Sequence, residues 1–376
     1  MLAAILGFVA VLSAGLNIWQ WWAAGRFPLH CRTAKRDFAP GVTLFKPLKG
    51  ADEETRACLE SWITQEYSGP VQILFGVADE GDPVCKTVQD LQDQFPSRSI
   101  ELFVCNPIIG ANAKVSTLRY LQQKAEHPFW VISDADVFAP SDLLAELVQK
   151  FQQPQVALVN CFYQLPPART MSMLWENIGV NADFWSQVCQ SNSLKPMNFA
   201  LGAVMAVRRG EMEMIDGFEP LLDQLADDYQ LGRRLADKGK KIELCNLVVE
   251  CREGAKGFVA VWKHQLRWAR TIRVCQPGPY FASILSNTTV WTIAWLFASP
   301  ESRLAPFCLF VRTVTAIHNG YRLTRNPAQA LEGLLAIGKD VAQFLVWLCA
   351  FVGNTVVWRG EKFRVKRGGQ LVKIQG

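Results

Sequence analysis

Two carboxylates at the end of an apolar run are the residues of this sequence best placed to do chemistry. Residues 129–132 are apolar and predict a buried strand, and Asp134 and Asp136 follow it, two residues apart. Side chains alternate along a strand, so positions i and i+2 point the same way. A divalent cation would relieve their repulsion, and carboxylates with substrate phosphates are a usual environment for Mg²⁺ or Mn²⁺. An isolated Asp-x-Asp is also common in solvated turns, so other residues must decide between a metal site and a turn.

Polar clusters follow other predicted strands as well. Strands are predicted at residues 41–45, 70–77, 100–105, 129–132 and 156–161, and helices between them at residues 53–65, 83–95 and 112–126. Lys46 and Lys49 follow the first strand, and Asp79 and Asp82 follow the second. Strands alternating with helices predict an α/β fold: a mostly parallel sheet with helices on both faces and ligand loops at its carboxyl edge. Polar clusters at that edge indicate a nucleotide site.

A further carboxylate pair opens a later helix. Residues 226–239 predict a helix that begins at Asp227 and Asp228 and stops at Gly239. We interpret Asp227 as a cap, because the helix dipole stabilises an acidic residue there. Asp228 is the better candidate for a functional carboxylate. Gly202 lies among small residues, where the backbone can approach a ligand closely.

Two amphipathic segments have two interpretations each. On a helix, Lys263, Arg267 and Arg270 fall at i, i+4 and i+7 and form one cationic stripe. The stripe predicts either a face lying against lipid headgroups or a clamp on a diphosphate. Residues 170–190 have a wide apolar face, which suits either a helix packed on the sheet or a functional element, at the membrane surface or as an acceptor wall.

The composition indicates a membrane protein. Half of the residues are hydrophobic and 19% are charged, and 13 are Trp, a residue that favours membrane interfaces. The net charge of +5 is too small to indicate nucleic acid as a partner and suits an anionic inner leaflet. The 11 Cys are odd in number, scattered and without a Cys-x-x-Cys, which indicates reduced thiols rather than disulfides or a zinc site.

The N-terminal segment predicts a membrane anchor. Residues 1–25 carry no formally charged side chain and, at about 1.5 Å per residue, are long enough to cross a bilayer as a helix. No basic segment precedes them, which favours an anchor over a cleaved signal peptide. Arg26, Arg32, Lys35 and Arg36 follow, so the positive-inside rule predicts that the next domain is cytoplasmic and the N-terminus outside.

Three apolar segments follow near the C-terminus, at residues 280–299, 304–321 and 334–358. The basic tail predicts a cytoplasmic end, which requires an odd number of crossings. We therefore expect one hairpin at residues 280–321 and an interfacial helix at 334–358; a re-entrant segment is the alternative. The predicted domains are an anchor at 1–25, a cytoplasmic catalytic domain at 40–275, transmembrane or interfacial helices at 280–358 and a basic tail at 359–376.

The order of the motifs resembles that of the ceramide glucosyltransferase family, glycosyltransferase family 21, membrane-bound relatives of the inverting family 2 enzymes. The motifs are Lys-Pro-Leu-Lys-Gly at 46–50, Val-Ala-Asp-Glu-Gly-Asp-Pro at 77–83, Asn-Ala-Lys at 112–114, Ser-Asp-Ala-Asp at 133–136, Asp-Asp-Tyr at 227–229 and an x-x-Arg-Trp motif that ends at Trp268. Residues 180–188 and 264–273 look most like the bacterial hopanoid-biosynthesis glycosyltransferases.

This resemblance implies a GT-A-like fold and a reaction. The reaction is inverting, metal-dependent transfer of glucose or N-acetylglucosamine from a UDP-sugar to a hydroxyl of a membrane lipid, a hopanoid polyol or ceramide, which gives a β-linked glycolipid. It also implies an integral protein of a bacterial inner membrane with its catalytic domain in the cytoplasm.

The resemblance also implies roles for residues of the sheet edge. Asp79 would bind the uracil end of the UDP-sugar, and Asp134 and Asp136 would hold Mg²⁺ or Mn²⁺ on its diphosphate. Asp228 would be the catalytic base. Lys114 would join the nucleotide-sugar contacts.

Lys49 would contact the nucleotide sugar as well, and His264, Arg267, Trp268 and Arg270 would close over the diphosphate. The family pattern is Gln-x-x-Arg-Trp, and His264 stands where the family has Gln. A His can still donate to a phosphate.

Two other functions compete with this one. A processive polysaccharide synthase normally keeps the Gln and usually has more membrane spans. A non-catalytic membrane scaffold on the same fold would not need every motif carboxylate, and all of them are present.

Overall fold

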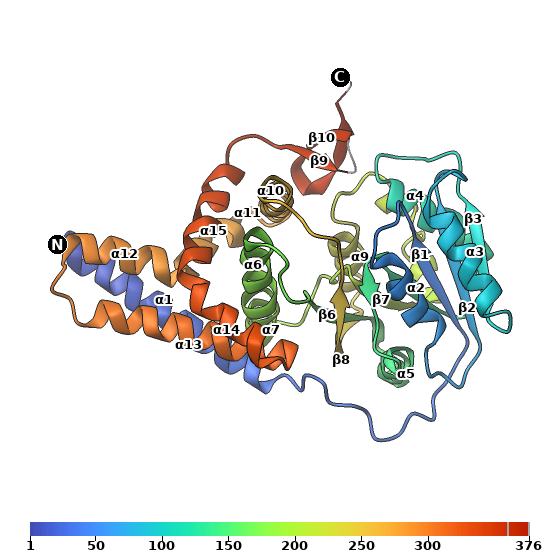
Figure 1. The fold of residues 1–376 in the computed structure, drawn as a ribbon, viewed down its shortest axis with the longest axis horizontal. Helices are drawn as coiled ribbons and strands as arrows, with labels where there is room; N and C mark the ends of the chain where they lie inside the picture. The colour runs from blue at the N-terminus through green and yellow to red at the C-terminus, as the bar shows by residue number, and fades with distance from the viewer. Residues whose placement is uncertain (359–360, 375–376) are drawn as a thin grey trace. The chain divides into compact units, whose positions relative to one another are not determined.

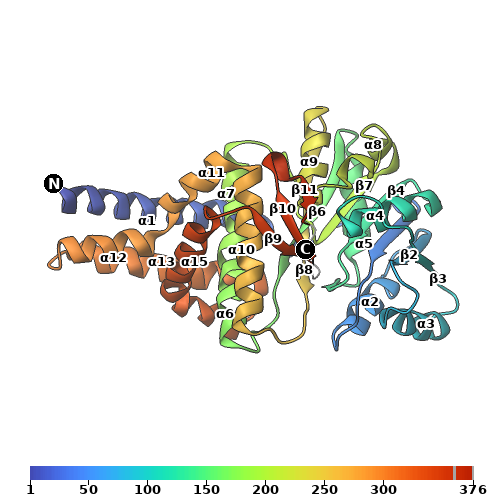
Figure 2. The same cartoon turned by 90° about the horizontal axis from the view of Figure 1, so that it is seen from above.

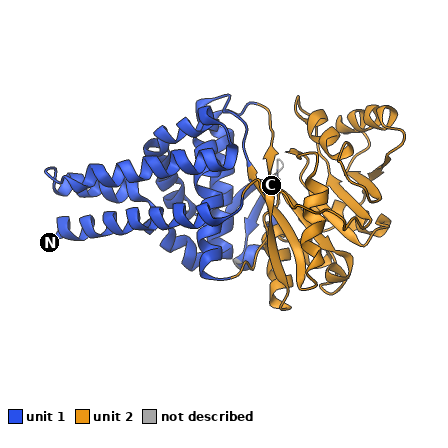
Figure 3. Ribbon diagram, turned by 90° about the horizontal axis from the view of Figure 1, so that it is seen from below, with its two compact units in different colours: residues 1–28, 164–195, 255–376 blue, residues 29–163, 196–254 orange. Residues whose placement is uncertain are grey.

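The computed structural model describes residues 1–358 and 361–374, which form two compact units (Figure 3). The sheet unit comprises residues 29–163 and 196–254, and the helical unit comprises residues 1–28, 164–195 and 255 onward. The predicted catalytic domain, residues 40–275, therefore draws on both units. Of the predicted basic tail, Arg359 lies outside the described residues.

The sheet unit contains an eight-stranded sheet in the order β3-β2-β1-β4-β7-β6-β8-β5 (Figure 1). Its strands are β1 (Val42–Pro47), β2 (Val71–Val77), β3 (Ser99–Val104), β4 (Phe129–Ser133), β5 (Val137–Phe138), β6 (Val156–Gln164), β7 (Val204–Arg208) and β8 (Lys241–Cys251). Strands β3, β2, β1 and β4 are parallel, whereas β7 runs antiparallel to both β4 and β6. All residues of β1 and β4 are buried, as expected for strands covered on both faces.

Helices connect these strands and create a switch in strand order. They are α2 (Thr55–Ile63), α3 (Val84–Gln94), α4 (Ala113–Leu121), α5 (Leu143–Gln149), α8 (Arg209–Glu213) and α9 (Asp227–Asp237). From β1 the chain moves outward to β2 and β3 and then returns to β4 on the other side of β1. In open α/β sheets, ligands bind beside the carboxyl ends of the strands at such a switch point. Asp134 directly follows β4, so the sequence placed it correctly at this edge.

The helical unit consists mainly of long helices, with a small C-terminal sheet. Its elements are α1 (Leu2–Arg26), α6 (Met171–Ile178), the π-helical segment η3 (Gly179–Phe184), α7 (Trp185–Leu194), α10 (Phe258–Cys275), α11 (Pro277–Ala282), α12 (Thr288–Ala298), α13 (Leu304–Thr324), α14 (Pro327–Leu331), α15 (Ala336–Ala350), β9 (Thr355–Trp358), β10 (Glu361–Val365) and β11 (Leu371–Lys373). Helices α1, α12 and α13 lie side by side (Figures 1 and 2). Residues 170–190 form α6, η3 and most of α7, which contact α10, α13 and α1 within this unit.

Two helical segments have the length and hydropathy of membrane spans, Leu2–Arg26 and Pro327–Ala350. A third candidate, Pro277–Ser286 with Thr288–Ala298, is bent by 53°. The N-terminal candidate coincides with the predicted anchor. Large apolar side chains such as Phe8 and Phe297 are exposed on these helices, which suits contact with lipid.

A buried ion network joins the helices of this unit. Arg312 on α13 donates to both carboxylate oxygens of Asp183 in η3, at 3.0 and 2.8 Å, and to Asp340 on α15, at 2.8 and 2.9 Å. Lys339 pairs with the same two carboxylates. Two cations therefore balance two anions, which is the condition for burying charge at acceptable cost.

This network predicts a difference between two Arg→Met substitutions. Arg312→Met leaves buried carboxylates without a partner and should lower the stability of the solubilised protein by about 3–5 kcal/mol. Arg209→Met removes an exposed i,i+4 pair with Glu213 and should cost at most about 1 kcal/mol. Thermal unfolding of the two variants in the same detergent checks this, and equal shifts in midpoint would contradict it.

Candidate active site

The switch point places a buried lysine beneath the Asp-x-Asp segment. Lys46 is the fifth residue of β1, and its ammonium donates to the carbonyl oxygen of Asp134 at 2.8 Å and to the hydroxyl of Ser133 at 3.2 Å. Burial lowers the pKa of Lys46 to about 8, against the opposing effect of the nearby carboxylates. Lys49, which the sequence analysis placed in the site, is exposed in the loop after β1. The lysine at the switch point is thus Lys46.

A second lysine connects the Asp-x-Asp segment to α9. Helix α4 begins after Asn112, whose side chain accepts from the Val115 amide, and this places Lys114 in the first turn. The Lys114 ammonium lies 2.7 Å from an Asp134 carboxylate oxygen and 3.2 Å from one of Asp227. Burial opposes the charge, but the two carboxylates outweigh it and raise the pKa of Lys114. Lys114 is therefore a fixed cation between two anions.

The interpretation of Asp227 as a helix cap was wrong. No side chain caps the N-terminus of α9, and Asp227 is buried in its ion pair with Lys114. A local rule could not find this partner, because Lys114 lies more than a hundred residues earlier in the chain.

Lys114, Asp134 and Asp227 form a chain of ion pairs, which we call the ion chain of Lys114. Asp228 follows Asp227, and its carboxylate occupies a space beside Gly202. One of its carboxylate oxygens accepts from the Tyr229 amide at 2.7 Å. A Cβ at Gly202 would lie 2.7 Å from the other oxygen, so a side chain at position 202 would have to displace this carboxylate. Burial, reinforced by the neighbouring Asp227, raises the pKa of Asp228 to about 6. Such a carboxylate is ionised at neutral pH and still basic enough to accept a proton.

Asp136 lies near two other carboxylates, Asp134 and Glu253, and one cation, Lys46. Burial, then Asp134 and Glu253, raise the pKa of Asp136 to about 7, with Lys46 opposing them. Carboxylate oxygens are hard donors of the kind that Mg²⁺ and Mn²⁺ prefer. Among residues 1–358 and 361–374, no three His, Cys, Asp or Glu side chains are arranged as a metal site. The donor set therefore fits a cation that takes its remaining ligands from substrate phosphates and water.

The two carboxylates after β2 have different environments. Asp79 is exposed, and its side chain accepts from the Gly81 amide at 3.0 Å. Asp82 accepts from the Gly50 amide with both oxygens at 2.9 Å and from the Val84 amide at 3.0 Å. Asp82 thus fixes the loop after β1 against the start of α3, whereas Asp79 remains accessible at the surface.

The remaining predicted residues lie in the helical unit, on α10. There the His264 imidazole contacts the Glu176 carboxylate of α6, with 2.6 Å between Nδ1 and the oxygen. The ring centroids of Trp268 and His264 lie 4.7 Å apart. Arg267, about one helical turn after His264, is partly buried. Arg270 donates to the carbonyl oxygens of Val352, at 2.7 Å, and Thr355. Its guanidinium holds the segment between α15 and β9. The predicted contact with a diphosphate would instead require these N–H groups to be available to the ligand.

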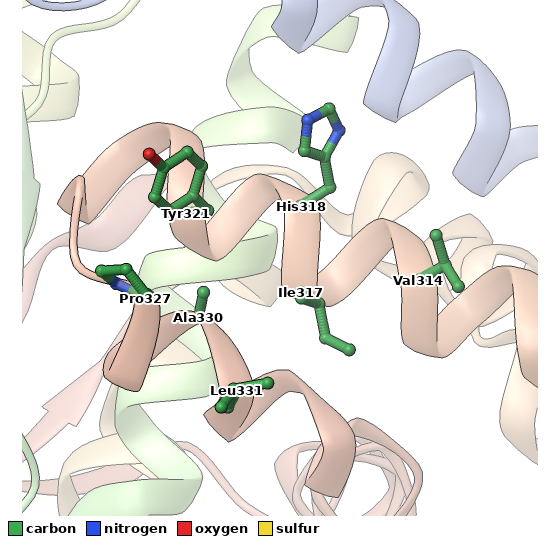
Figure 4. A pocket seen from close by; sticks show the side chains of 7 residues that line it. All are labelled: Val314, Ile317, His318, Tyr321, Pro327, Ala330 and Leu331. Atoms are coloured by element: carbon green, nitrogen blue, oxygen red, sulfur yellow. The ribbon is translucent and has the colours of Figure 1, made fainter.

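The helical unit also contains an apolar groove of about 490 Å³ (Figure 4). It is lined by Val314, Ile317, His318 and Tyr321 of α13 and by Pro327, Ala330 and Leu331 of α14. None of the residues predicted to act in the site lines it.

Comparison with known proteins decides the family. The sequence model described as "Glycosyl transferase family 21" matches residues 2–371. The chain belongs to this family. It is therefore a glycosyltransferase, and the predicted family resemblance is confirmed.

Individual relatives extend the comparison. Ceramide glucosyltransferase 3 of Caenorhabditis elegans is 21% identical over 99% of this chain and 83% of its own length. A ceramide glucosyltransferase of Komagataella phaffii is 28% identical over 97% of this chain and 90% of its own length. Among solved structures, the mannosyltransferase PcManGT from Pyrobaculum calidifontis, in complex with GDP-Man and Mn²⁺, is 19% identical with a TM-score of 0.56 and covers 90% of this chain and 99% of that chain. This likeness concerns the fold and confirms the predicted GT-A-like class.

The space that Gly202 leaves for Asp228 generates a prediction. Gly202→Ala should displace the Asp228 carboxylate and lower the glycosyltransferase rate by about tenfold or more, because small misplacements of a reacting group are costly. Gly210→Ala is the matched control, since a Cβ there meets nothing within 4 Å. Initial rates of the two variants, with unfolding temperatures alongside, make the comparison. Equal rates would show that the contact with Gly202 does not position Asp228.

Proposed function

We propose that this glycosyltransferase transfers glucose or N-acetylglucosamine from a UDP-sugar to a hydroxyl of a membrane lipid, with inversion, to give a β-linked glycolipid. The observation that carries the proposal is the ion chain of Lys114, which ties the Asp-x-Asp segment after β4 to the start of α9, where Asp228 stands. The relatives that are named ceramide glucosyltransferases favour glucose and a ceramide-like acceptor. A hopanoid polyol is the alternative acceptor, on the resemblance of residues 180–188 and 264–273.

The proposed mechanism uses one displacement and no enzyme nucleophile. Asp228 removes the proton from the acceptor hydroxyl as its oxygen attacks the anomeric carbon, and the bond to the diphosphate breaks. Asp134 and Asp136 would hold Mg²⁺ or Mn²⁺, which when bound supplies positive charge to the leaving diphosphate. Lys114 keeps Asp134 in place for this role.

Most of the other predicted residues are proposed to contact the nucleotide sugar, and one is not. Asp79 is proposed to contact the uracil and the exposed Lys49 the nucleotide sugar. His264, Arg267 and Trp268 are proposed to bind the diphosphate, as the family motif suggests. We leave Arg270 out, because backbone carbonyls already engage its guanidinium.

The site is proposed to lie on the cytoplasmic side of a bacterial inner membrane. The cluster of Arg26, Arg32, Lys35 and Arg36 after the candidate span α1 supports this orientation. The proposed domains are the anchor, the catalytic domain at 40–275 and the C-terminal membrane helices.

The environment of Asp228 predicts the pH dependence of the reaction. A base must be deprotonated to act, and burial raises the pKa of this carboxyl from 3.8 to about 6. The turnover number should therefore rise from pH 5 to 7 with a midpoint near 6. Steady-state rates at saturating donor measure this; a rate that is flat to pH 5, or that rises as pH falls, would count against Asp228 as the base.

Sugar transfer itself is the direct test of the proposed function. Membranes containing the protein are given radiolabelled UDP-glucose or UDP-N-acetylglucosamine with Mn²⁺, Mg²⁺ or chelator, and with ceramide and hopanoid acceptors. We expect label in a chloroform-soluble product with one donor, lost with chelator and at least about 10³-fold lower in Asp228→Asn. Asp237→Asn, on the same helix in an exposed pair with Arg233, is the matched control and should retain activity.

Two outcomes would contradict the proposal. Label that appears only in a water-soluble polymer would indicate a processive synthase. No transfer from either donor, to either acceptor, would favour a scaffold.

A further inference from the structure

The clearest polar contact that the mechanism leaves unused lies between α6 and α10. Glu176 on α6 is 5% exposed, and its carboxylate accepts from two consecutive residues of α10, His264 and Gln265. The distances are 2.6 Å to the Nδ1 atom of His264 and 3.0 Å to the amide nitrogen of Gln265. A buried carboxylate requires such donors, because burying an unpaired charge is costly.

The contact fixes the proton arrangement of the imidazole. A carboxylate only accepts hydrogen bonds, so the Nδ1 atom of His264 carries the hydrogen. Although burial opposes ionisation, the hydrogen bond from His264, the charge of Lys256 and the hydrogen bond from Gln265 hold the pKa of Glu176 below its usual range. The anionic Glu176 lies where it can balance a positive charge on the ring.

The second ring nitrogen of His264 remains available. Among the described parts of the chain, Glu176 is the only hydrogen-bond partner of this ring, and 22% of the His264 side chain is exposed. Trp268 packs edge-on against the ring, with 4.7 Å between centroids, and Phe184 lies 6.5 Å from Trp268. Packing and hydrogen bonding together hold the imidazole in one orientation with its Nε2 atom uncommitted.

We propose that Glu176 is a positioning residue that orients and pairs with His264 as an imidazolium, whose Nε2–H donates to the departing diphosphate. This inference rests on the proposed function. As the bond between the anomeric carbon and the diphosphate oxygen breaks, its electron pair goes to the diphosphate, the acceptor oxygen forms the new bond, and Asp228 takes the acceptor proton. His264 loses no proton in this step; it supplies charge and a hydrogen bond where negative charge develops.

The proposal accounts for the departure from the family motif. A Gln at position 264 would donate a hydrogen bond but carry no charge, and would need no carboxylate to keep it charged. A His carries a charge when it is protonated, and Glu176 supplies the carboxylate that balances this charge. The alternative is a purely structural role, in which Glu176 ties α6 to α10 through both hydrogen bonds.

Charge neutralisation separates these roles. Glu176→Gln keeps an acceptor oxygen and the side-chain shape but removes the charge, so we measure it in the wild-type and His264→Gln backgrounds. We expect it to lower kcat about tenfold or more in the wild type, with the donor KM nearly unchanged. In the His264→Gln background the same change should lower kcat by less than about threefold.

Glu211→Gln is the matched control, because Glu211 is also a buried carboxylate in an ion pair, with Lys240. It should leave kcat unchanged. Equal losses from Glu176→Gln in both backgrounds, or no loss in the wild type, would overturn the inference and leave a structural contact.

Affinity for UDP in the presence of Mn²⁺ distinguishes failure of this inference from failure of the proposed function. UDP carries the charge that the leaving group develops, so Glu176→Gln should weaken its binding about tenfold in the wild type but not in the His264→Gln background. If the wild type forms no glycolipid, the proposed function is overturned and UDP binding alone judges the inference. Absence of UDP binding, or equal affinities for wild type and Glu176→Gln, would overturn the inference.

Discussion

The candidate site in the sheet unit depends on the buried ammonium group of Lys114. Lys114 compensates the carboxylates of Asp134, at the end of β4, and Asp227, at the start of α9. Without this cation the two carboxylates would repel each other, and the buried Asp227 would lack its ion-pair partner. The arrangement gathers more carboxylates than it neutralises; burial raises the pKa values of Asp136 and Asp228, and the neighbouring carboxylates add to this effect. The chemistry proposed for the site, binding a cation and accepting a proton, uses that surplus.

The helical unit also buries charged side chains, but there two cations and two carboxylates balance each other. Asp183, in the π-helical segment η3, is held by Arg312 and by Lys339. π-helical segments are rare and often occur at functional sites. This one continues directly from α6, which carries Glu176, and it contains Phe184, whose ring approaches that of Trp268. The candidate membrane-spanning helices and the Arg-Trp motif of α10 therefore both contact one continuous helical element.

The sequence was informative where burial and strand geometry act locally. Strands β1, β2 and β4 were predicted because each is a largely apolar run followed by polar residues, and parallel strands place those residues at one edge. Strands β7 and β8 were not predicted: one lies in a run of small residues, and the other alternates irregularly between buried and partly exposed positions. The roles of Asp227 and Glu176 also escaped prediction, because their partners lie about a hundred residues away in the chain, and only the fold brings them together. Lys46 was noted among the polar residues after the first predicted strand, but its burial and its contacts with Ser133 and Asp134 depend on the pairing of β1 with β4 and could not be predicted.

We propose above all that Asp134 and Asp136 bind a divalent cation together with a nucleoside diphosphate. It is tested most directly by titrating Mn²⁺ into the solubilised protein with and without UDP and following free Mn²⁺ by electron paramagnetic resonance. The account predicts one Mn²⁺ site that forms only with UDP, is lost in Asp136→Asn and persists in Asp228→Asn. A UDP-dependent site that survives Asp136→Asn, or no such site in the wild type, would contradict it.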